Sequence, residues 1–442
     1  MSSVKKIDAK SENAVHSALN IFGVPPTNIS VTRSQIREIL PLNAIDETNT
    51  FEFRHFSDNQ WLDLSRTYLY LQLQLQKYVN NEWVRMDLTD ASVAPVQAIG
   101  NSLVRQIRMH INGTEIYNST ALYPYISYMK NELNYSNDVK DTWLAPSGYF
   151  REDKFDDANS AGFTKRQQMM GNGQICEFMS RLDFDLANQH QYILNNLDVL
   201  FTIYKNDDAF LIQNLSNNQT TPLRVKVHSI KLFVKTLEVQ PSLNLSVMNM
   251  LEKTSAKYPM RRTEIRSCYI DSGRTEYTHN IFTNVLPRRI VVGMVTNRAF
   301  KGDQTLDPFH FQPFKLREVS VNAGGIMYPT NRYQMNWTEQ PGHALSFMRP
   351  YMDMMDATMS SPNVTNGITA EKFEDGWTFF VIPLTSTLED TEGFELIKNG
   401  TTTLYLRFNE ALTQGLELIV LAEFDQVLSI DQHRVVVGDG EV

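Results

Sequence analysis

The most constraining feature of this sequence is a succession of strand and helix signals that occurs twice. Residues 103–117 alternate apolar and polar side chains, turn at a glycine and end on a tyrosine, and residues 316–328 repeat this order. A helical stretch, an irregular segment and further strands follow in each half. The spacing between matching positions falls from about 211 residues, at the two closing tyrosines, to about 193, between Leu237 and Ile430. Such drift is expected when loops differ in length and strands are kept.

Within each half the local pattern has a period of two, which is typical of strands with one buried face. The leucines at 69, 71, 73 and 75 alternate with glutamines. Asn112-Gly113 separates two alternating runs and predicts a type I′ hairpin turn. Further strands are predicted at 178–186, 199–204, 223–239, 377–384, 403–408 and 416–430.

Three helical stretches interrupt the strands. Apolar residues from Leu122 to Leu133 are spaced four, three and four apart, which predicts an amphipathic helix. After Pro241, residues 243–251 predict a second helix with Ser242 as its N-cap. A third helical patch is predicted at 344–351.

These signals predict an all-β fold of two tandem jelly-roll β-sandwiches, a double jelly roll with short helices in the connections. About eight strands in each half fit a two-sheet jelly roll better than a propeller or a helical repeat array. The chain is divided into an N-terminal arm (1–33), a first jelly roll (34–240), a linker helix (241–257), a second jelly roll (258–431) and a C-terminal tail (432–442).

The arm shows a different pattern from the rest of the chain. Val15, Ala18, Leu19 and Phe22 fall at helical spacing, and Pro25-Pro26 then stops any helix and forces extended backbone.

The net charge and the two cysteines limit the classes of function that this protein can have. The chain has 41 Lys and Arg against 50 Asp and Glu, a net charge of −9, which disfavours wrapping around nucleic acid. Cys176 and Cys268 lie far apart without ligand spacing, so we interpret them as reduced thiols of a protein made inside the cell. Residues 1–6 show no apolar h-region, so we expect no secretory signal, and no apolar run approaches the ~18 residues of a membrane span.

Motifs with catalytic chemistry are weak. The histidines form no HxH or HExxH pair, and no GxSxG or P-loop is present. Ser127 and Lys130 match SxxK by chance, and Gly171-Asn172-Gly173 is interpreted as a turn. Asp183 and Asp185 are expected on one face of a strand, where solvation is their usual role. We therefore predict no enzyme, no catalytic or metal-binding residues and no cofactor.

Other residues are candidates for contacts. The methionines at 348, 352, 354, 355 and 359 fit either a pliable surface between copies or core filling. Arg261-Arg262 and Arg288-Arg289 could form bidentate pairs with carboxylates across an interface, although exposed strand-end charges are the commoner outcome. Residues 135–177 and 352–376 are the longest irregular stretches of the two halves, and we expect them to protrude.

Several ordered segments resemble the major capsid proteins of Polinton/Maverick elements and adintoviruses. The resemblance is densest between residues 258 and 330 and includes Tyr258-Pro-Met-Arg-Arg262. The other matching segments are Pro25-Pro26-Thr27-Asn28, Leu62-Asp63-Leu64, Asn280 to Met294, Ala299 to Gly302 and Asp307 to Phe314. The first 20 residues and the stretch 144–177 do not share it.

The resemblance implies a structural, hexon-like major capsid protein of the double jelly-roll lineage. Such a subunit forms homotrimers, which are pseudo-hexameric capsomers that tile an icosahedral capsid around double-stranded DNA. The expected partners are neighbouring capsomers, a penton protein with a single jelly roll and minor capsid proteins, the last of which the arm could contact. The expected location is the virion, after synthesis and assembly inside the host cell. Sequence-specific nucleic acid binding and a membrane span are not expected.

Two alternatives of other classes stay open. A bicupin-like metalloenzyme would need three or four ligands converging inside one barrel. A carbohydrate- or receptor-binding double β-sandwich would gather surface aromatics at one loop end.

Overall fold

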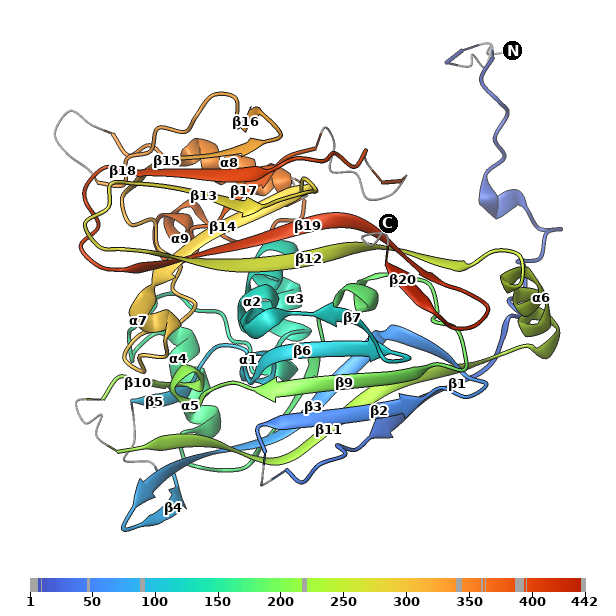
Figure 1. Cartoon of the computed structure of the whole chain (residues 1–442), viewed down its shortest axis with the longest axis horizontal. Coiled ribbons are helices and arrows are strands. Elements are labelled where there is room, and N and C mark those ends of the chain that lie inside the picture. The colour runs from blue at the N-terminus through green and yellow to red at the C-terminus, as the bar shows by residue number, and fades with distance from the viewer. Residues whose placement is uncertain are drawn as a thin grey trace.

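Two β-sandwiches lie beside each other, with helices α2 (Tyr123–Asn134) and α3 (Asn137–Thr142) between them (Figure 1). The computed structural model describes residues 7–438 except 9, 46–47, 88–91, 217–220, 339–343, 359–360, 362, 386–392 and 395.

The first sandwich contains two antiparallel sheets and a short ribbon. One sheet has the order β1-β11-β3-β4, with β8 also pairing with β3. The facing sheet has the order β2-β9-β6-β7, and β10 pairs with β5. The strands are β1 (Val31–Ile39), β2 (Thr50–Phe56), β3 (Trp61–Val79), β4 (Glu82–Arg85), β5 (Val93–Pro95), β6 (Val104–Ile111), β7 (Thr114–Asn118), β8 (Cys176–Arg181), β9 (Asp198–Lys205), β10 (Ile212–Asn214) and β11 (Leu223–Val239).

The second sandwich is built in the same way. Its sheets have the orders β12-β19-β14-β17, with β20 pairing with β19, and β13-β18-β15-β16. The strands are β12 (Ala256–Ile270), β13 (Glu276–Phe282), β14 (Arg289–Thr296), β15 (Leu316–Ala323), β16 (Ile326–Tyr328), β17 (Phe380–Pro383), β18 (Thr402–Phe408), β19 (Leu416–Ile430) and β20 (Val436–Gly438).

The two sandwiches have the same strand connectivity. The path β1-β11-β3-β8 in the first corresponds to β12-β19-β14-β17 in the second, and β2-β9-β6-β7 corresponds to β13-β18-β15-β16. In both, the first and last long strands are neighbours in one sheet. This is the arrangement of two jelly rolls in tandem, so the predicted fold class is confirmed.

Helices occupy the connections between strands. Besides α2 and α3, the helices are α1 (Ile99–Ser102), α4 (Ala161–Met170), α5 (Asp208–Leu211), α6 (Pro241–Leu251), α7 (Asn297–Phe300), α8 (Met348–Ala357) and α9 (Ala370–Glu374). Short 3₁₀ turns are η1 (Ser17–Leu19), η2 (Thr120–Leu122), η3 (Ala145–Ser147) and η4 (Asp185–Asn188).

The strongest local predictions are confirmed. The leucines at 69, 71, 73 and 75 are all buried along β3, while the alternating glutamines are half-buried on its other face. Asn112 and Gly113 have φ values of 50° and 83°, as a type I′ turn between β6 and β7 requires. Helix α2 spans the predicted amphipathic stretch.

Other local predictions were wrong. Gln240, not Ser242, precedes α6 and makes no side-chain cap, and Pro241, which has no N–H that needs an acceptor, occupies the first helical turn. The patch at 344–351 becomes helical only from Met348. In the arm, the helical spacing produces only η1, since no buried surface holds its apolar face.

The arm stands apart from the sandwiches. Residues 10–29 are exposed along their whole length, and Phe22 is 93% exposed. Figure 1 shows this segment leaving the body beside α6, where β1 begins. At the other terminus, Arg434 donates from Nε to the carbonyl of Asn195 at 3.0 Å, so the start of the tail contacts the first sandwich.

Buried apolar side chains from both sandwiches form one continuous cluster. The units therefore share a core across their contact. The predicted boundaries of the five segments stay predictions.

Candidate functional site

Aromatic side chains join the two sandwiches. Tyr125 and Tyr128 on α2 point toward the segment after α7 in the second sandwich. The Tyr128 ring stacks on Phe309 with centroids 4.4 Å apart, and Tyr125 contacts Phe309 edge-on at 5.7 Å. Phe300 and Phe311 also lie against Tyr125. We call this aromatic contact and the polar groups around it the seam.

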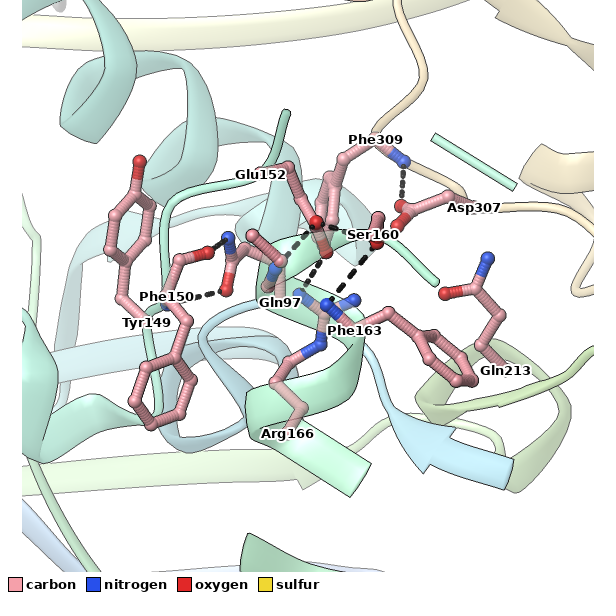
Figure 2. Close-up of polar contacts among 12 residues, drawn as sticks. Gln97, Tyr149, Phe150, Glu152, Ser160, Phe163, Arg166, Gln213, Asp307 and Phe309 are labelled. Atoms are coloured by element: carbon pink, nitrogen blue, oxygen red, sulfur yellow. Dashed lines mark hydrogen bonds and ion pairs between the residues drawn. The ribbon is translucent and has the colours of Figure 1, made fainter. Parts of the chain in front are cut away.

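A buried ion pair lies next to the aromatic contact (Figure 2). Arg166 on α4 is 0% exposed and forms an ion pair with Glu152 through Nη1. Its Nε donates to the carbonyl of Pro95 at 2.9 Å. Glu152 also accepts hydrogen bonds from the hydroxyl of Ser160 at 2.9 Å and the amide of Gly162 at 3.0 Å. These bonds compensate for much of the desolvation that burial of two charges costs.

Residues of the second sandwich complete this polar cluster. Lys372 donates from Nζ to the carbonyl of Glu152 at 2.8 Å. The backbone amide of Asp307 donates to the carboxylate of Asp156. Burial raises the pKa of Asp307 to about 7, although the nearby charge of Arg166 acts in the opposite direction. The seam therefore has a carboxyl group that titrates near neutral pH.

His310 bridges carboxylates from both sandwiches. Its Nδ1 lies 2.9 Å from Asp156 and its Nε2 lies 3.2 Å from Asp375. The ring stacks on Phe155 with centroids 4.7 Å apart. Burial alone would lower the pKa of His310, but the hydrogen bonds and charges of the two carboxylates outweigh burial and raise the pKa to about 9. At neutral pH the imidazole is therefore a cation between two anions.

A second buried ion pair joins α2 to α3. Lys140 on α3 contacts Glu132 at 2.8 Å and donates to the carbonyl of Asn366 in the second sandwich, also at 2.8 Å. The hydroxyl of Tyr149 donates to Glu132 at 2.6 Å. The segments before α4 and before α9 are thus tied together.

The expectation that residues 135–177 and 352–376 protrude was wrong for much of their described length. The two segments pack against each other at the seam, where Lys140, Glu152, Arg166 and Phe373 are buried. They also contain α3, α4, most of α8 and α9, which were predicted as loop. Irregular sequence did not mean an exposed loop here, because the burial is provided by the other half of the chain.

The paired arginines form intrachain contacts. Arg289 makes a bidentate pair with Glu423 on the adjacent β19, with distances of 2.6 and 3.1 Å. Arg261 pairs with Asp425 on β19, and Arg262 pairs with Glu264 at 2.8 Å. A bidentate fork thus occurs, but within the second sandwich. Pairing across an interface with another copy stays a prediction.

The carboxylates at 183 and 185 do not share a strand face, because β8 ends at Arg181. Asp183 lies 3.2 Å from Lys130 on α2. Asp185 begins η4 and accepts a hydrogen bond from the amide of Thr263 on β12 at 3.1 Å. Burial raises the pKa of Asp185 to about 7, against the lowering effect of Lys130. Asp185 therefore belongs to the contact between the sandwiches.

The remaining sequence candidates are structural. Ser127 is buried on α2 and accepts a hydrogen bond from the amide of Asn101 at 2.6 Å. Gly173 has a φ of 67° in the turn after α4. On α8, Met348 and Met352 are exposed and Met354 is buried, while position 359 lies outside the described residues. The methionines thus divide between core and surface.

The described part of the chain lacks both a grouped set of metal ligands and a bilayer-length apolar helix. Among those residues, no three or more His, Cys, Asp or Glu side chains are grouped to hold a metal ion. No described helix has the length and apolar character needed to cross a bilayer.

A relative of similar length occurs in a nematode. No protein-family model matches the chain. An uncharacterized protein of Caenorhabditis elegans, F54H12.2, is 28% identical over 422 residues, which cover 93% of this chain and 98% of that protein.

Solved structures with the same fold come from viruses. A chain of the Sputnik virophage has a TM-score of 0.64 and 12% identity, and the match covers 99% of this chain and 94% of that chain. A chain of the PBCV-1 virus capsid has a TM-score of 0.61 and 9% identity over 95% of this chain and 100% of that one. The mavirus major capsid protein has a TM-score of 0.56 and 10% identity over 98% and 96%. These likenesses extend over both sandwiches and establish the shared fold.

Proposed function

We propose that this protein is a major capsid protein, a structural subunit without catalytic residues. The supporting observation is the pair of sandwiches with the same connectivity, packed side by side through a buried seam. The whole-chain likeness to viral capsid proteins supports the same role. A shell subunit must keep its shape when it contacts its neighbours. A seam of stacked aromatics and buried ion pairs holds the two sandwiches in a fixed relative orientation.

The proposed assembly is a homotrimer. Two similar units in each of three subunits give six similar edges, so a trimer with threefold symmetry fills a sixfold position in an icosahedral shell. We propose that these pseudo-hexameric capsomers enclose double-stranded DNA, with neighbouring capsomers, a penton protein and minor capsid proteins as partners. The acidic chain suits a wall that need not bind its genome tightly.

We further propose that the protein belongs to the Polinton/Maverick and adintovirus group. The support is the ordered resemblance between residues 258 and 330, together with a relative of nearly full length in an animal. An element integrated into an animal genome would encode such a relative.

The proposed segments keep the boundaries expected from the sequence, with jelly rolls at 34–240 and 258–431. The arm at 1–33 is proposed to contact a neighbouring subunit, because its exposed apolar residues gain burial only against another surface.

Light scattering combined with size-exclusion chromatography tests the trimer. We expect a trimer at micromolar concentration, since a specific subunit contact should bury more than ~1,000 Å². Negative-stain electron microscopy should show capsomers with a pseudo-hexagonal outline. A protein that stays monomeric at micromolar concentration and forms no such particles would contradict the proposal.

A further inference from the structure

The two sandwiches of one chain meet through two different surfaces. The first sandwich contributes α2, the end of β8 and the segment that follows β8, including Lys130 and Asp183. The second contributes the outer face of the sheet β12-β19-β14, including Arg289 and Glu423. Because the two sandwiches have the same connectivity, each of these surfaces has a counterpart in the other sandwich.

The counterpart of the surface around α2 is a groove beside α8. Helix α8 lies in the connection from β16 to β17, as α2 lies in the connection from β7 to β8. The groove has a volume of about 620 Å³ and is lined by α8, the end of β17 and the segment after β16. Asp356 in its lining is exposed, and Met348 and Met352 on the same helix are 54% and 52% exposed. We call this surface, with the exposed side chains of α8, the α8 groove.

The counterpart of the sheet β12-β19-β14 is the sheet β1-β11-β3. Burial alternates along β11, so Lys231 and Lys235 point away from the core. Ile36 of β1 pairs with Lys235, lies on the same face and is 59% exposed. The matching strand β12 differs, because its Thr263 is 7% exposed and contacts Asp185 of the first sandwich. We call the outer surface of β1, β11 and β3 the sheet face.

The α8 groove and the sheet face have complementary charge. Strands β1, β3 and β11 together contain eight Lys or Arg and three Asp or Glu. The lining of the α8 groove contains Asp353 and Asp356 against Arg349. Figure 1 shows the two surfaces on opposite sides of the pair of sandwiches, with α8 at the top and β3 and β11 at the bottom. Complementary charge favours the encounter of two such surfaces from different copies.

We propose that the α8 groove of one copy binds the sheet face of a second copy. This contact repeats, between subunits, the contact that the surface around α2 and the sheet β12-β19-β14 make within one chain. The inference rests on the proposed trimer and specifies its contact. Each subunit uses both surfaces once, so the contact is heterologous and three copies close into a ring. Burial of the exposed Ile36, Met348 and Met352 would stabilise this ring.

Two variants of the full chain test the contact. Ile36→Glu places an acid on the sheet face opposite the acidic groove, and Asp356→Arg places a cation in the α8 groove opposite the basic sheet. Each should raise the concentration needed for half-assembly of the trimer at least about tenfold, because like charges placed opposite each other disfavour a contact. Light scattering with size-exclusion chromatography measures this shift. Both residues are exposed, so the subunits should still fold, which circular dichroism verifies.

Leu245→Glu on α6 and Asp271→Arg in the turn after β12 are the matched controls. Both residues are exposed and lie outside the α8 groove and the sheet face. We expect both controls to assemble like the wild type. Controls that dissociate as readily as the two test variants would overturn the assignment.

Mixing the two test variants shows whether the two surfaces meet each other. At a concentration at which each variant alone is monomeric, an equimolar mixture should contain a larger species. The unchanged α8 groove of the Ile36→Glu variant can bind the unchanged sheet face of the Asp356→Arg variant. A mixture that stays monomeric at high micromolar concentration would overturn the pairing of these surfaces.

The same measurements separate this inference from the proposed function. A trimeric wild type whose two test variants assemble equally well would overturn the inference and leave the proposed trimer standing. A wild type that is monomeric at micromolar concentration would overturn both.

Discussion

Replacing His310 by Gln should weaken folding in a pH-dependent manner. The folded protein holds His310 at a pKa of about 9, against 6.5 for an ordinary histidine. Each pKa unit corresponds to about 1.4 kcal/mol, so the charged imidazole contributes at most about 3 kcal/mol. The groups responsible are Asp156 and Asp375, which the neutral amide of Gln cannot replace.

The direction with pH follows from the raised pKa. The unfolded chain loses the His310 proton near pH 6.5 and the folded chain near pH 9. The stabilisation is therefore complete below pH 6.5 and is lost as the pH rises through 9. The variant should be less stable than the wild type by about 3 kcal/mol at pH 6, and the two should converge by pH 10.

Urea denaturation at pH 6, 8 and 10 measures this difference in the free energy of unfolding. His279→Gln provides the matched control, because His279 is exposed in the same sandwich and its replacement should have a small effect. A difference for His310→Gln that stays constant or grows with pH would refute the charge-bridge argument.

The remaining predictions concern the seam and the arm. Phe309→Ala should lower the free energy of unfolding by about 3–5 kcal/mol in calorimetry, because its ring is fully buried against Tyr128; a loss below about 1 kcal/mol would contradict its place in the seam. Arg166→Met should cost about 3–5 kcal/mol by leaving Glu152 charged and buried, and adding Glu152→Gln should restore part of the loss; a double variant less stable than the single one would argue against this reason. Deleting residues 1–29 should leave the thermal midpoint of the subunit unchanged, because these residues are exposed where described, but should reduce capsid assembly in electron micrographs. Particles indistinguishable from those of the full chain would exclude an assembly role for the arm.

The sandwich framework was predictable because its signals are local. The leucine alternation from Leu69 to Leu75 needs only a strand with one buried face. Asn112-Gly113 needs only the steric freedom of two residues at positive φ. The repeated order of such signals was enough to predict two like units, and the observed connectivity agrees.

The seam was not predictable because its partners are distant in sequence. Arg166 lies among polar residues of α4, and its burial depends on contacts to Glu152 and Pro95, which are 14 and 71 residues away in the chain. His310 appeared as one of nine scattered histidines, and nothing near it in the chain indicates Asp156. Asp185 was placed on a strand because Phe178 to Leu186 continue the alternation, but Asp185 instead turns into η4 and meets Thr263. Contacts between the two sandwiches produce no periodic pattern in the sequence of either sandwich.

The adjacency of first and last strands in each sandwich has a consequence for how such a chain can arise. Because β1 pairs antiparallel with β11, the polypeptide leaves the first unit at the end where it came in. Helix α6 is then long enough to start β12 beside that point, and β19 brings the chain back to the same end (Figure 1). A gene fusion of two copies therefore needs only one short connector. The two sandwiches then have the same orientation, with their equivalent ends on the same side.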